Sequence, residues 1–464
     1  MLLNRRKSSM NHQFKHLALP YFDIADQLLF DWSKINSCYD ETTSKVGQPF
    51  GKGVKDALNY IGKVAEKDGF NVAYNDGYAT EISYGQGPII GVYAHADVVP
   101  VSGSWTYPPF SGTIANGRMY GRGTSDDKGP AMAAYLAMKL LKDKGLINGY
   151  TARLVIGGNE ERGSACLHYY FHTLKKPQAV AGFTPDGEFP LIYGEKGISN
   201  YKLEGIVSLN PIHRINAGVV SNSVIDRAEA IVDYNEKWET YLKATKHHYE
   251  IEHINNQTRL VIFGKAAHGS LPELGINAGL ILLDVLGNFY KLDFLTKLAQ
   301  QYRDPFGHNL EAYYESKLLH HTTYNVGLIN YESGVFSMVV NFRYPETVDL
   351  DATINKIAGQ TDVPVTILMR SHPLLFDPNS SLVQILLKAY QQESGDFKSQ
   401  MMTIGGGTYA KEAHNIVAFG SHFPNKDDHI HDVDEKIDLV DLHSSIGIYA
   451  RAIYDLGMHH ALKK

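Results

Sequence analysis

Four short apolar segments of this chain lead directly into side chains that can bind a metal ion. The segments span residues 92–94, 154–158, 179–183 and 416–420, and the polar side chains that follow them are His95 with Asp97, Glu160 with Glu161, Asp186, and a histidine-rich stretch that reaches His431. In an open α/β sheet, ligands bind where the strands end. Histidine nitrogen and carboxylate oxygen suit a divalent cation. Four such strand ends predict one shared metal site.

The first pair, His95 and Asp97, is separated by one residue. Side chains alternate along an extended chain, so both should lie on the same face. One can bind a metal while the other accepts the second imidazole N–H and fixes the tautomer. The pair taken alone is equally compatible with a structural role.

Two adjacent acids, Asp126 and Asp127, lie in a glycine-rich segment, residues 121–130. Neighbouring carboxylates repel each other unless a cation compensates them, and the glycines indicate unusual backbone torsions. One carboxylate that bridges two metals would explain the arrangement. The alternative is a solvated acidic turn before a helix N-terminus.

Glu160 and Glu161 form the pair with the clearest mechanistic meaning. Adjacent side chains near a strand end point in different directions, so one can bind a metal while its neighbour faces the substrate. A carboxylate beside a metal-bound water suits general-base catalysis. The alternative, two surface glutamates in a loop, is weakened by the glycines at 157, 158 and 163 that flank the pair.

The last two candidates come from a tight turn and from a loop. Asp186 lies between Pro185 and Gly187, where a structural turn aspartate is the alternative. His429 and His431 both follow the fourth apolar segment, and spacing alone does not choose between them.

The elements that must position these residues follow an α/β pattern. After residue 69, apolar strands alternate with helical stretches such as residues 131–141, which predicts a mixed, mostly parallel sheet flanked by helices. Between residues 199 and 375 the pattern changes and no strand ends in metal-binding side chains. We therefore expect a discontinuous catalytic domain, residues 1–198 and 376–464, interrupted by an inserted α+β domain, residues 199–375.

Composition restricts the class of protein. The chain has 464 residues, a net charge of −6 and no lysine- or arginine-rich stripe, which argues against nucleic acid as the main partner. No apolar run is long enough to span a membrane, no signal peptide is evident, and residues 1–9 are expected to be an extension. The two cysteines, Cys38 and Cys166, are expected to be packing residues. A cytoplasmic protein is predicted.

In this order, the motifs resemble those of the co-catalytic di-zinc metallopeptidases that include carboxypeptidase G, aminoacylase and carnosinase. Within that group the chain is most similar to the PepV-type (Xaa-His or beta-Ala-Xaa) dipeptidases. The resemblance covers nearly the whole chain, from about Phe14 onward. It rests on the motifs above together with residues 123–130, 183–190 and 404–409 and the spacing His431-x-x-x-Glu435.

The resemblance implies two divalent metal ions, with zinc expected and manganese or cobalt as alternatives. Asp126 would bridge them, His95 and Asp186 would complete one site, and Glu161 and His431 would complete the other. It selects His431 over His429 because Glu435 follows in the expected register. Asp97 would orient His95, Glu160 would activate the bridging water, and the peptide between Asp126 and Asp127 would be cis.

The resemblance also makes the inserted domain a lid that contacts substrate. His268 and Asn222 would stabilise the oxyanion, and Arg343 would bind the terminal carboxylate of the substrate. The backbone N–H groups of Gly405, Gly406 and Gly407 could bind the same carboxylate. Without the resemblance, each of these would be an ordinary lid residue. An insertion of this size favours a monomer.

The predicted function is hydrolysis of the peptide bond of unblocked dipeptides. The near alternative is an N-acyl amino acid deacylase of the same superfamily, and a catalytically inactive metal-binding protein is a third possibility. The first two differ in the pocket for a free amino group, for which Asp127 or Glu188 could supply a negative partner.

Overall fold

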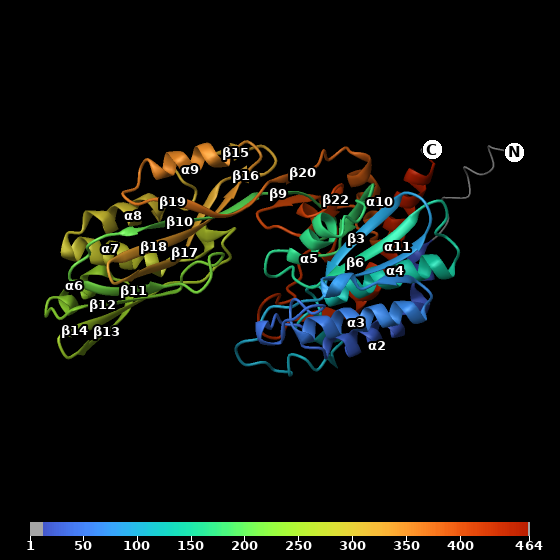
Figure 1. Ribbon diagram of the computed structural model, residues 1–464, viewed down its shortest axis with the longest axis horizontal. Coiled ribbons are helices and arrows are strands. Elements are labelled where there is room, and N and C mark those ends of the chain that lie inside the picture. The colour runs from blue at the N-terminus through green and yellow to red at the C-terminus, as the bar shows by residue number, and fades with distance from the viewer. Residues whose placement is uncertain (1–12, 463–464) are drawn as a thin grey trace. The chain divides into compact units, whose positions relative to one another are not determined.

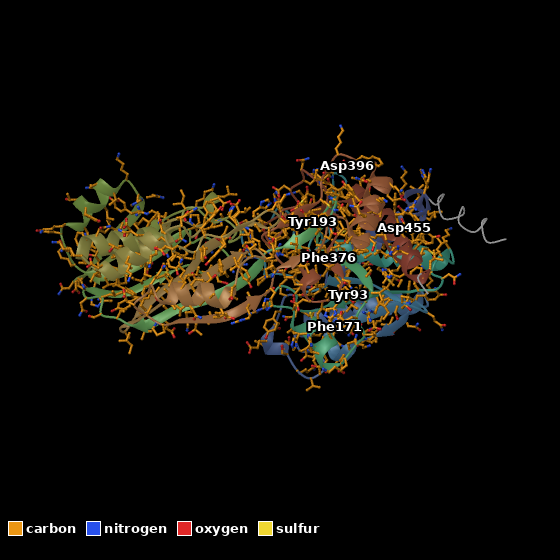
Figure 2. All side chains as sticks on the ribbon, turned by 90° about the horizontal axis from the view of Figure 1, so that it is seen from above. Tyr93, Phe171, Tyr193, Phe376, Asp396 and Asp455 are labelled. Atoms are coloured by element: carbon orange, nitrogen blue, oxygen red, sulfur yellow. The ribbon has the colours of Figure 1, made fainter. Side chains whose placement is uncertain are left out.

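The computed structural model describes residues 13–462, which form two compact units (Figure 1). The first unit contains the chain up to Tyr193, Phe376–Met402 and the residues from Thr408 onward, and the second contains Gly194–Leu375 and Thr403–Gly407. The expected extension, residues 1–9, lies outside the described residues. Tyr193 and Phe376, labelled in Figure 2, are the residues of the first unit that flank Gly194–Leu375, and the N–H of Phe376 donates to the carbonyl of Tyr193 at 2.9 Å.

The second unit begins before the expected boundary at residue 199. Strand β9 (Ile192–Glu195) already pairs with the short strand β20 (Leu374–Leu375) at Gly194 and Glu195. The unit also takes in residues 403–407, because the Thr403 hydroxyl donates to the carbonyl of Leu318 at 2.7 Å. The predicted insert, residues 199–375, therefore lies within a slightly larger unit.

The first unit is built on a mixed sheet whose centre is parallel. In it, β3 pairs in parallel with β6 and β7, β7 pairs in parallel with β22, and β1, β2 and β9 add antiparallel edges. The bounds of the main-sheet strands are β1 Asn71–Ala73, β2 Ala79–Gly85, β3 Ile89–His95, β6 Thr151–Gly157, β7 Ala181–Thr184 and β22 Ile416–Ala418. The smaller strands are β4 Thr113–Ala115, β5 Arg118–Tyr120, β8 Gly187–Glu188, β21 Met402–Ile404, β23 Ser421–His422 and β24 Lys436–Asp438.

Helices cover this sheet, which confirms the expected fold class. They are α1 Phe14–Leu17, α2 Phe22–Ser33, α3 Lys52–Lys67, α4 Lys128–Asp143, α5 Ala165–His168, α10 Ser381–Ser394 and α11 Leu439–Ala461. Helices α4 and α11 pack on each other and against β3 and β6, while α3 packs against β1 and β2. In this arrangement β3 and β6 are almost entirely buried, and their carboxyl ends lie together with His95 in register with Gly157.

The second unit is an antiparallel sheet of eight strands with helices. The strand order is β13-β14-β12-β11-β17-β18-β10-β19. The bounds are β10 Gly197–Ile206, β11 Ile212–Ala217, β12 Arg227–Asp233, β13 His248–Ile254, β14 Gln257–Phe263, β17 Thr323–Glu332, β18 Val335–Tyr344 and β19 Val365–Ser371, with a β15–β16 hairpin at Glu315–Ser316 and His320–His321. The helices are α6 Trp238–Thr245, α7 Ala278–Tyr290, α8 Asp293–Arg303 and α9 Leu350–Ala358.

Strand periodicity separates the two faces of this second sheet. Val340 and Phe342 of β18 belong to the apolar core of the unit. Because side chains alternate along a strand, Asn341 and Arg343 point to the opposite face. This places Arg343 on a polar face although it is only 4% exposed. Among residues 13–462, no helix is long and apolar enough to cross a membrane.

Candidate metal centre

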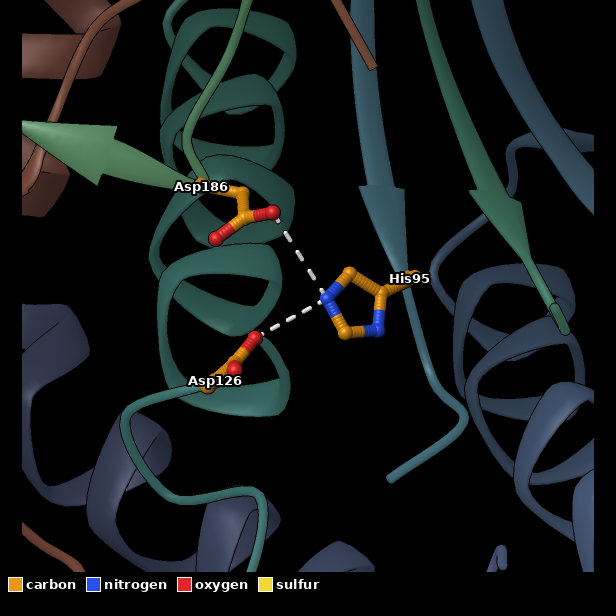
Figure 3. A group of neighbouring side chains, drawn as sticks. All are labelled: His95, Asp126 and Asp186. Atoms are coloured by element: carbon orange, nitrogen blue, oxygen red, sulfur yellow. Dashed lines mark hydrogen bonds and ion pairs between the residues drawn. The ribbon is translucent and has the colours of Figure 1, made fainter. Parts of the chain in front are cut away.

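Three of the predicted ligands meet at the carboxyl end of β3 (Figure 3). The Nε2 atom of His95 lies 3.0 Å from Oδ1 of Asp126 and 3.7 Å from Oδ2 of Asp186. His95 is fully buried. One potential ligand atom from each of the three residues lies within 4.8 Å of the others. Asp126 precedes α4 and Asp186 follows β7, so a strand end, a helix N-terminus and a turn converge here.

A second group shares Asp126 with the first. The Nε2 atom of His431 lies 2.9 Å from Oδ2 of Asp126 and 3.1 Å from Oε1 of Glu161. The two oxygens of Asp126 therefore face different histidines, Oδ1 facing His95 and Oδ2 facing His431. A carboxylate between two such groups has the arrangement of a ligand that bridges two ions. His429 belongs to neither group of described residues.

The charges in the centre are those of a cation site. Burial raises the pKa of Asp186 to about 6 and that of Glu161 to about 7, and the nearby Asp126 carboxylate adds to both shifts. Burial acts in the same direction on Asp126, but hydrogen bonds from His431 and His95 hold the pKa of this carboxyl well below its ordinary value. One buried and two half-buried carboxylates thus gather around two histidines, an arrangement that a divalent cation would stabilise.

Asp97 organises the turn that carries the two glutamates. Its Oδ1 accepts the Glu160 N–H at 3.0 Å and its Oδ2 accepts the Glu161 N–H at 3.1 Å. The Nδ1 atom of His95 lies closer to the backbone carbonyl of Asp97, at 3.0 Å, than to its carboxylate, at 3.5 Å. The main chain of Asp97 is therefore the nearer partner of the His95 ring, and the carboxylate holds the glutamate turn.

Glu160 has the electrostatic environment of a proton acceptor. Burial raises its pKa well above the ordinary value, His95 opposes this shift, and Asp186 and Glu161 reinforce it. Among the described residues, Glu160 is absent from both candidate ligand groups. A raised pKa makes the Glu160 carboxylate a stronger base than an ordinary exposed glutamate, which suits general-base catalysis.

Asp127 is buried next to the candidate metal centre and contacts the backbone of His95. The peptide bond between Asp126 and Asp127 is cis, as the resemblance implies. Asp127 is fully buried, and its Oδ2 accepts the backbone N–H of His95 at 3.0 Å. Glu188, the other residue considered for a free amino group, is exposed in β8. Of these two acids, only Glu188 is accessible to solvent.

Sequence reasoning missed several residues around the centre. His422 is half-buried with its Nδ1 3.0 Å from Oδ2 of Asp428, and it acts electrostatically on Asp186. The Tyr409 ring stands edge-on to His95 at 6.1 Å between centroids, and its hydroxyl lies 2.9 Å from the thiol of Cys166. No local spacing signals these contacts. In the sequence, Glu435 serves only to select His431 over His429. In the structure it is fully buried beside the Asp126 turn.

The predicted substrate-binding residues lie in the second unit. The Nε atom of Arg343 donates to Oδ1 of Asn341 at 2.7 Å, and its guanidinium also donates to the carbonyl of Gly405 at 2.9 Å. The carbonyl of Asn222 accepts the N–H of Gly269 at 2.7 Å, which ties Asn222 to the loop that carries His268. The unit thus forms two clusters, Arg343 with the 405–407 loop and Asn222 with the His268 loop.

Comparisons with known proteins agree on one family. The model of the family described as Peptidase family M20/M25/M40 matches residues 91–455. The protein named Putative dipeptidase YtjP, from Bacillus subtilis (strain 168), is 36% identical over 447 residues, which cover 92% of this chain and 96% of that protein.

Solved structures share the fold. Human carnosine dipeptidase 1 superposes with a TM-score of 0.58 at 14% identity, covering 96% of this chain and 98% of that one. The di-peptidase Dug1p from Saccharomyces cerevisiae superposes with a TM-score of 0.59, again at 14% identity and with the same coverage. At such identity the likeness is one of fold.

Proposed function

Because the chain belongs to peptidase family M20/M25/M40 and is a metal-dependent dipeptidase, we propose that it binds two divalent ions at the carboxyl ends of β3, β6 and β7. One ion would be held by His95, Asp126 and Asp186, and the other by Asp126, Glu161 and His431. The observation that carries this proposal is the Asp126 carboxylate, whose two oxygens face His95 and His431 at 3.0 Å and 2.9 Å.

Histidine and carboxylate ligands fit zinc, and they also fit manganese and cobalt. We take zinc as the expected ion. When bound, such ions supply Lewis-acid polarisation of a carbonyl and lower the pKa of water toward neutrality. The buried acids described above fit this charge, since a cation would compensate carboxylates whose pKa values burial has raised.

Glu160 is the proposed general base. Its backbone is fixed by Asp97, its pKa is raised, and the neighbouring Glu161 faces His431. Glu160 would take a proton from the attacking water and return it to the leaving amine. Asp97 would keep Glu160 and Glu161 in their separate directions, so that one transfers protons while the other holds an ion.

Arg343 is the proposed partner of the substrate's terminal carboxylate. Burial lowers the pKa of its guanidinium to about 10, and no acidic side chain of residues 13–462 forms an ion pair with it. A desolvated cation of this kind gains most from a carboxylate ligand. The N–H groups of Gly405, Gly406 and Gly407 would bind the same carboxylate.

His268 and Asn222 would stabilise the oxyanion, and the inserted domain, residues 199–375, would act as a lid. We further propose that the enzyme is a cytoplasmic monomer that acts on dipeptides. These assignments follow the resemblance of the motifs and are supported by the close packing of the Asn222 and His268 loops.

Substrate and metal can be tested together. The purified protein is treated with a chelator, dialysed, and assayed after addition of zinc, manganese or cobalt. The substrates are unblocked dipeptides, tripeptides and N-acetylated amino acids. We expect dipeptide hydrolysis that is lost on chelation and restored by at least one ion. Turnover of N-acetylated amino acids without turnover of unblocked dipeptides would favour the deacylase, and no turnover of any substrate with bound metal would favour an inactive protein.

A further inference from the structure

A buried carboxylate holds the backbone of the Asp126 turn. Glu435 is fully buried, and its Oε1 accepts three backbone N–H groups, from Gly123 at 2.9 Å, Ser125 at 3.0 Å and Asp126 at 3.2 Å. Its Oε2 accepts a hydrogen bond from the guanidinium of Arg122 at 2.6 Å. The donors are Arg122 and three residues of the turn that it begins, so one side chain binds nearly the whole turn.

The hydrogen bonds of Glu435 restrict the conformation of the Asp126 turn. Three N–H groups that converge on one oxygen form an anion-binding concavity of the main chain. Removing a carboxylate from water is costly unless it is paired and hydrogen-bonded, and here Arg122 compensates the charge. The main chain adds a further link, since the N–H of Gly121 donates to the carbonyl of Glu435 at 2.9 Å. The Asp126 turn therefore has few alternative conformations while Glu435 is present.

The same segment supplies a candidate ligand. Glu435 follows His431 by four residues, and the side chain of His431 is 52% exposed. Next to Glu435, the carbonyl of Lys436 accepts the hydroxyl of Ser125 at 3.0 Å. The loop that presents His431 is thus fastened to the turn that presents Asp126, about 310 residues away in sequence.

We propose that Glu435 is a positioning residue that sets the Asp126 carboxylate between the two ions and fixes the loop of His431. The proposal rests on the proposed metal centre. Among the described residues, Glu435 belongs to neither candidate ligand group, and it acts through the backbone of Asp126. Because Asp126 belongs to both candidate groups, loss of the Glu435 carboxylate weakens the binding of both ions together.

The test uses Glu435→Gln and the milder Glu435→Asp. In the glutamine variant, the amide NH₂ group must face either Arg122 or the three backbone N–H groups. Both are hydrogen-bond donors, so the bonds on that side of the side chain are lost. The matched control is Glu393→Gln, because Glu393 is another buried carboxylate in the same unit and pairs with Arg451 at 3.0 Å outside the centre. Asp126→Asn serves as the reference for loss of the centre itself.

For each chelated protein, zinc and cobalt affinities are measured by competition with a chromogenic chelator, together with the cobalt absorption spectrum and the melting temperature. We expect both Glu435 variants to bind metal about 10–100-fold more weakly, with a changed cobalt spectrum. Glu393→Gln should lower the melting temperature and leave affinity and spectrum unchanged.

Unchanged affinity and spectrum in the Glu435 variants, with a fall only in melting temperature, would overturn the proposal. Metal retained by Asp126→Asn would overturn the metal centre, so the two failures are distinguishable. Hydrogen exchange of the unmodified, metal-free protein covers the case in which the variants do not fold. The amides of Gly123, Ser125 and Asp126 should exchange slowly, and exchange as fast as in exposed loops would refute the proposal.

Discussion

The carboxylate of Asp97 accepts the backbone N–H of Glu160 at 3.0 Å, and this contact fixes where the proposed base stands. Its second oxygen accepts the N–H of Glu161 at 3.1 Å. The backbone carbonyl of Asp97, at 3.0 Å, is the nearer partner of the His95 ring. Asp97 therefore joins the end of β3 to the end of β6. Its carboxylate positions the backbone of Glu160 and Glu161, a role beyond fixing the tautomer of His95.

Asp97→Asn should separate this positioning from metal binding. The amide NH₂ would face one of the two N–H donors, so the Glu160–Glu161 turn would shift. We expect kcat to fall about 10–100-fold, while KM changes little. Steady-state kinetics at saturating metal provide the measurement. The control is Asp349→Asn, which makes the same change in a carboxylate that accepts one backbone N–H at the start of α9. The amide oxygen can still accept there, and kcat should stay at the wild-type value. Wild-type kcat in Asp97→Asn would contradict the role.

The neighbours Glu160 and Glu161 should give opposite results when each is changed to glutamine. Glu160→Gln removes the proton acceptor, so kcat should fall about 10²–10⁴-fold with metal content unchanged. Glu161→Gln removes a ligand opposite His431, so one of two ions should be lost or bound more weakly. Activity and metal content by plasma mass spectrometry are measured on the same samples. Full turnover in Glu160→Gln would refute the assigned base.

Much of the candidate site can be predicted from sequence because it follows from strand ends. His95 is the last residue of the buried strand β3 and Asp186 closely follows β7. The parallel pairing of β3 with β7 brings them to one edge of the sheet. Glu161 follows β6, whose Gly157 is in register with His95. Local apolar runs therefore predict these positions. His431 is different, since it comes from an exposed loop well beyond β22 and was selected only by resemblance.

The rest depends on contacts that no local pattern encodes. Asp127 is one of the two predicted partners of a substrate amino group, yet it is buried and accepts the N–H of His95. Glu435 binds a turn more than 300 residues away, because the register of the folded chain decides which donors a buried carboxylate meets. The second unit likewise begins at Gly194, shortly before the predicted boundary at residue 199. These partners and boundaries depend on the three-dimensional packing of segments that are far apart in the sequence.

Arg343→Met should weaken the binding of substrates that carry a free terminal carboxylate. A hydrogen bond to a charged group contributes about 1.5–3 kcal/mol, so KM should rise about 10–100-fold for a dipeptide. The corresponding dipeptide amide should be a poor substrate of the wild type and should be little affected by the change. Arg370→Met, which removes an exposed arginine paired with Asp351 in the same unit, is the control and should leave KM unchanged. An equal rise for acid and amide would contradict the assignment.

Asp455, labelled in Figure 2, should make stability depend on pH outside the metal centre. Burial raises its pKa to about 6, Arg451 opposes the shift and Glu393 adds to it. The unfolded carboxyl titrates near pH 3.9. Between about pH 4 and pH 6 the folded protein therefore holds a proton on Asp455 that the unfolded chain has lost. The contribution of Asp455 to stability falls as pH rises through this window and then stays level.

Asp455→Asn cannot ionise, so its stability relative to the wild type should improve as pH rises from about 5 to about 7.5. The midpoint of urea unfolding is measured at both pH values on chelated protein, so that metal occupancy does not contribute. The exposed Glu236→Gln is the control and should show no such difference between the two pH values. The raised pKa would be contradicted by an Asp455→Asn difference that is the same at both pH values, because the aspartate would then carry equal charge in the folded and unfolded chains throughout this range.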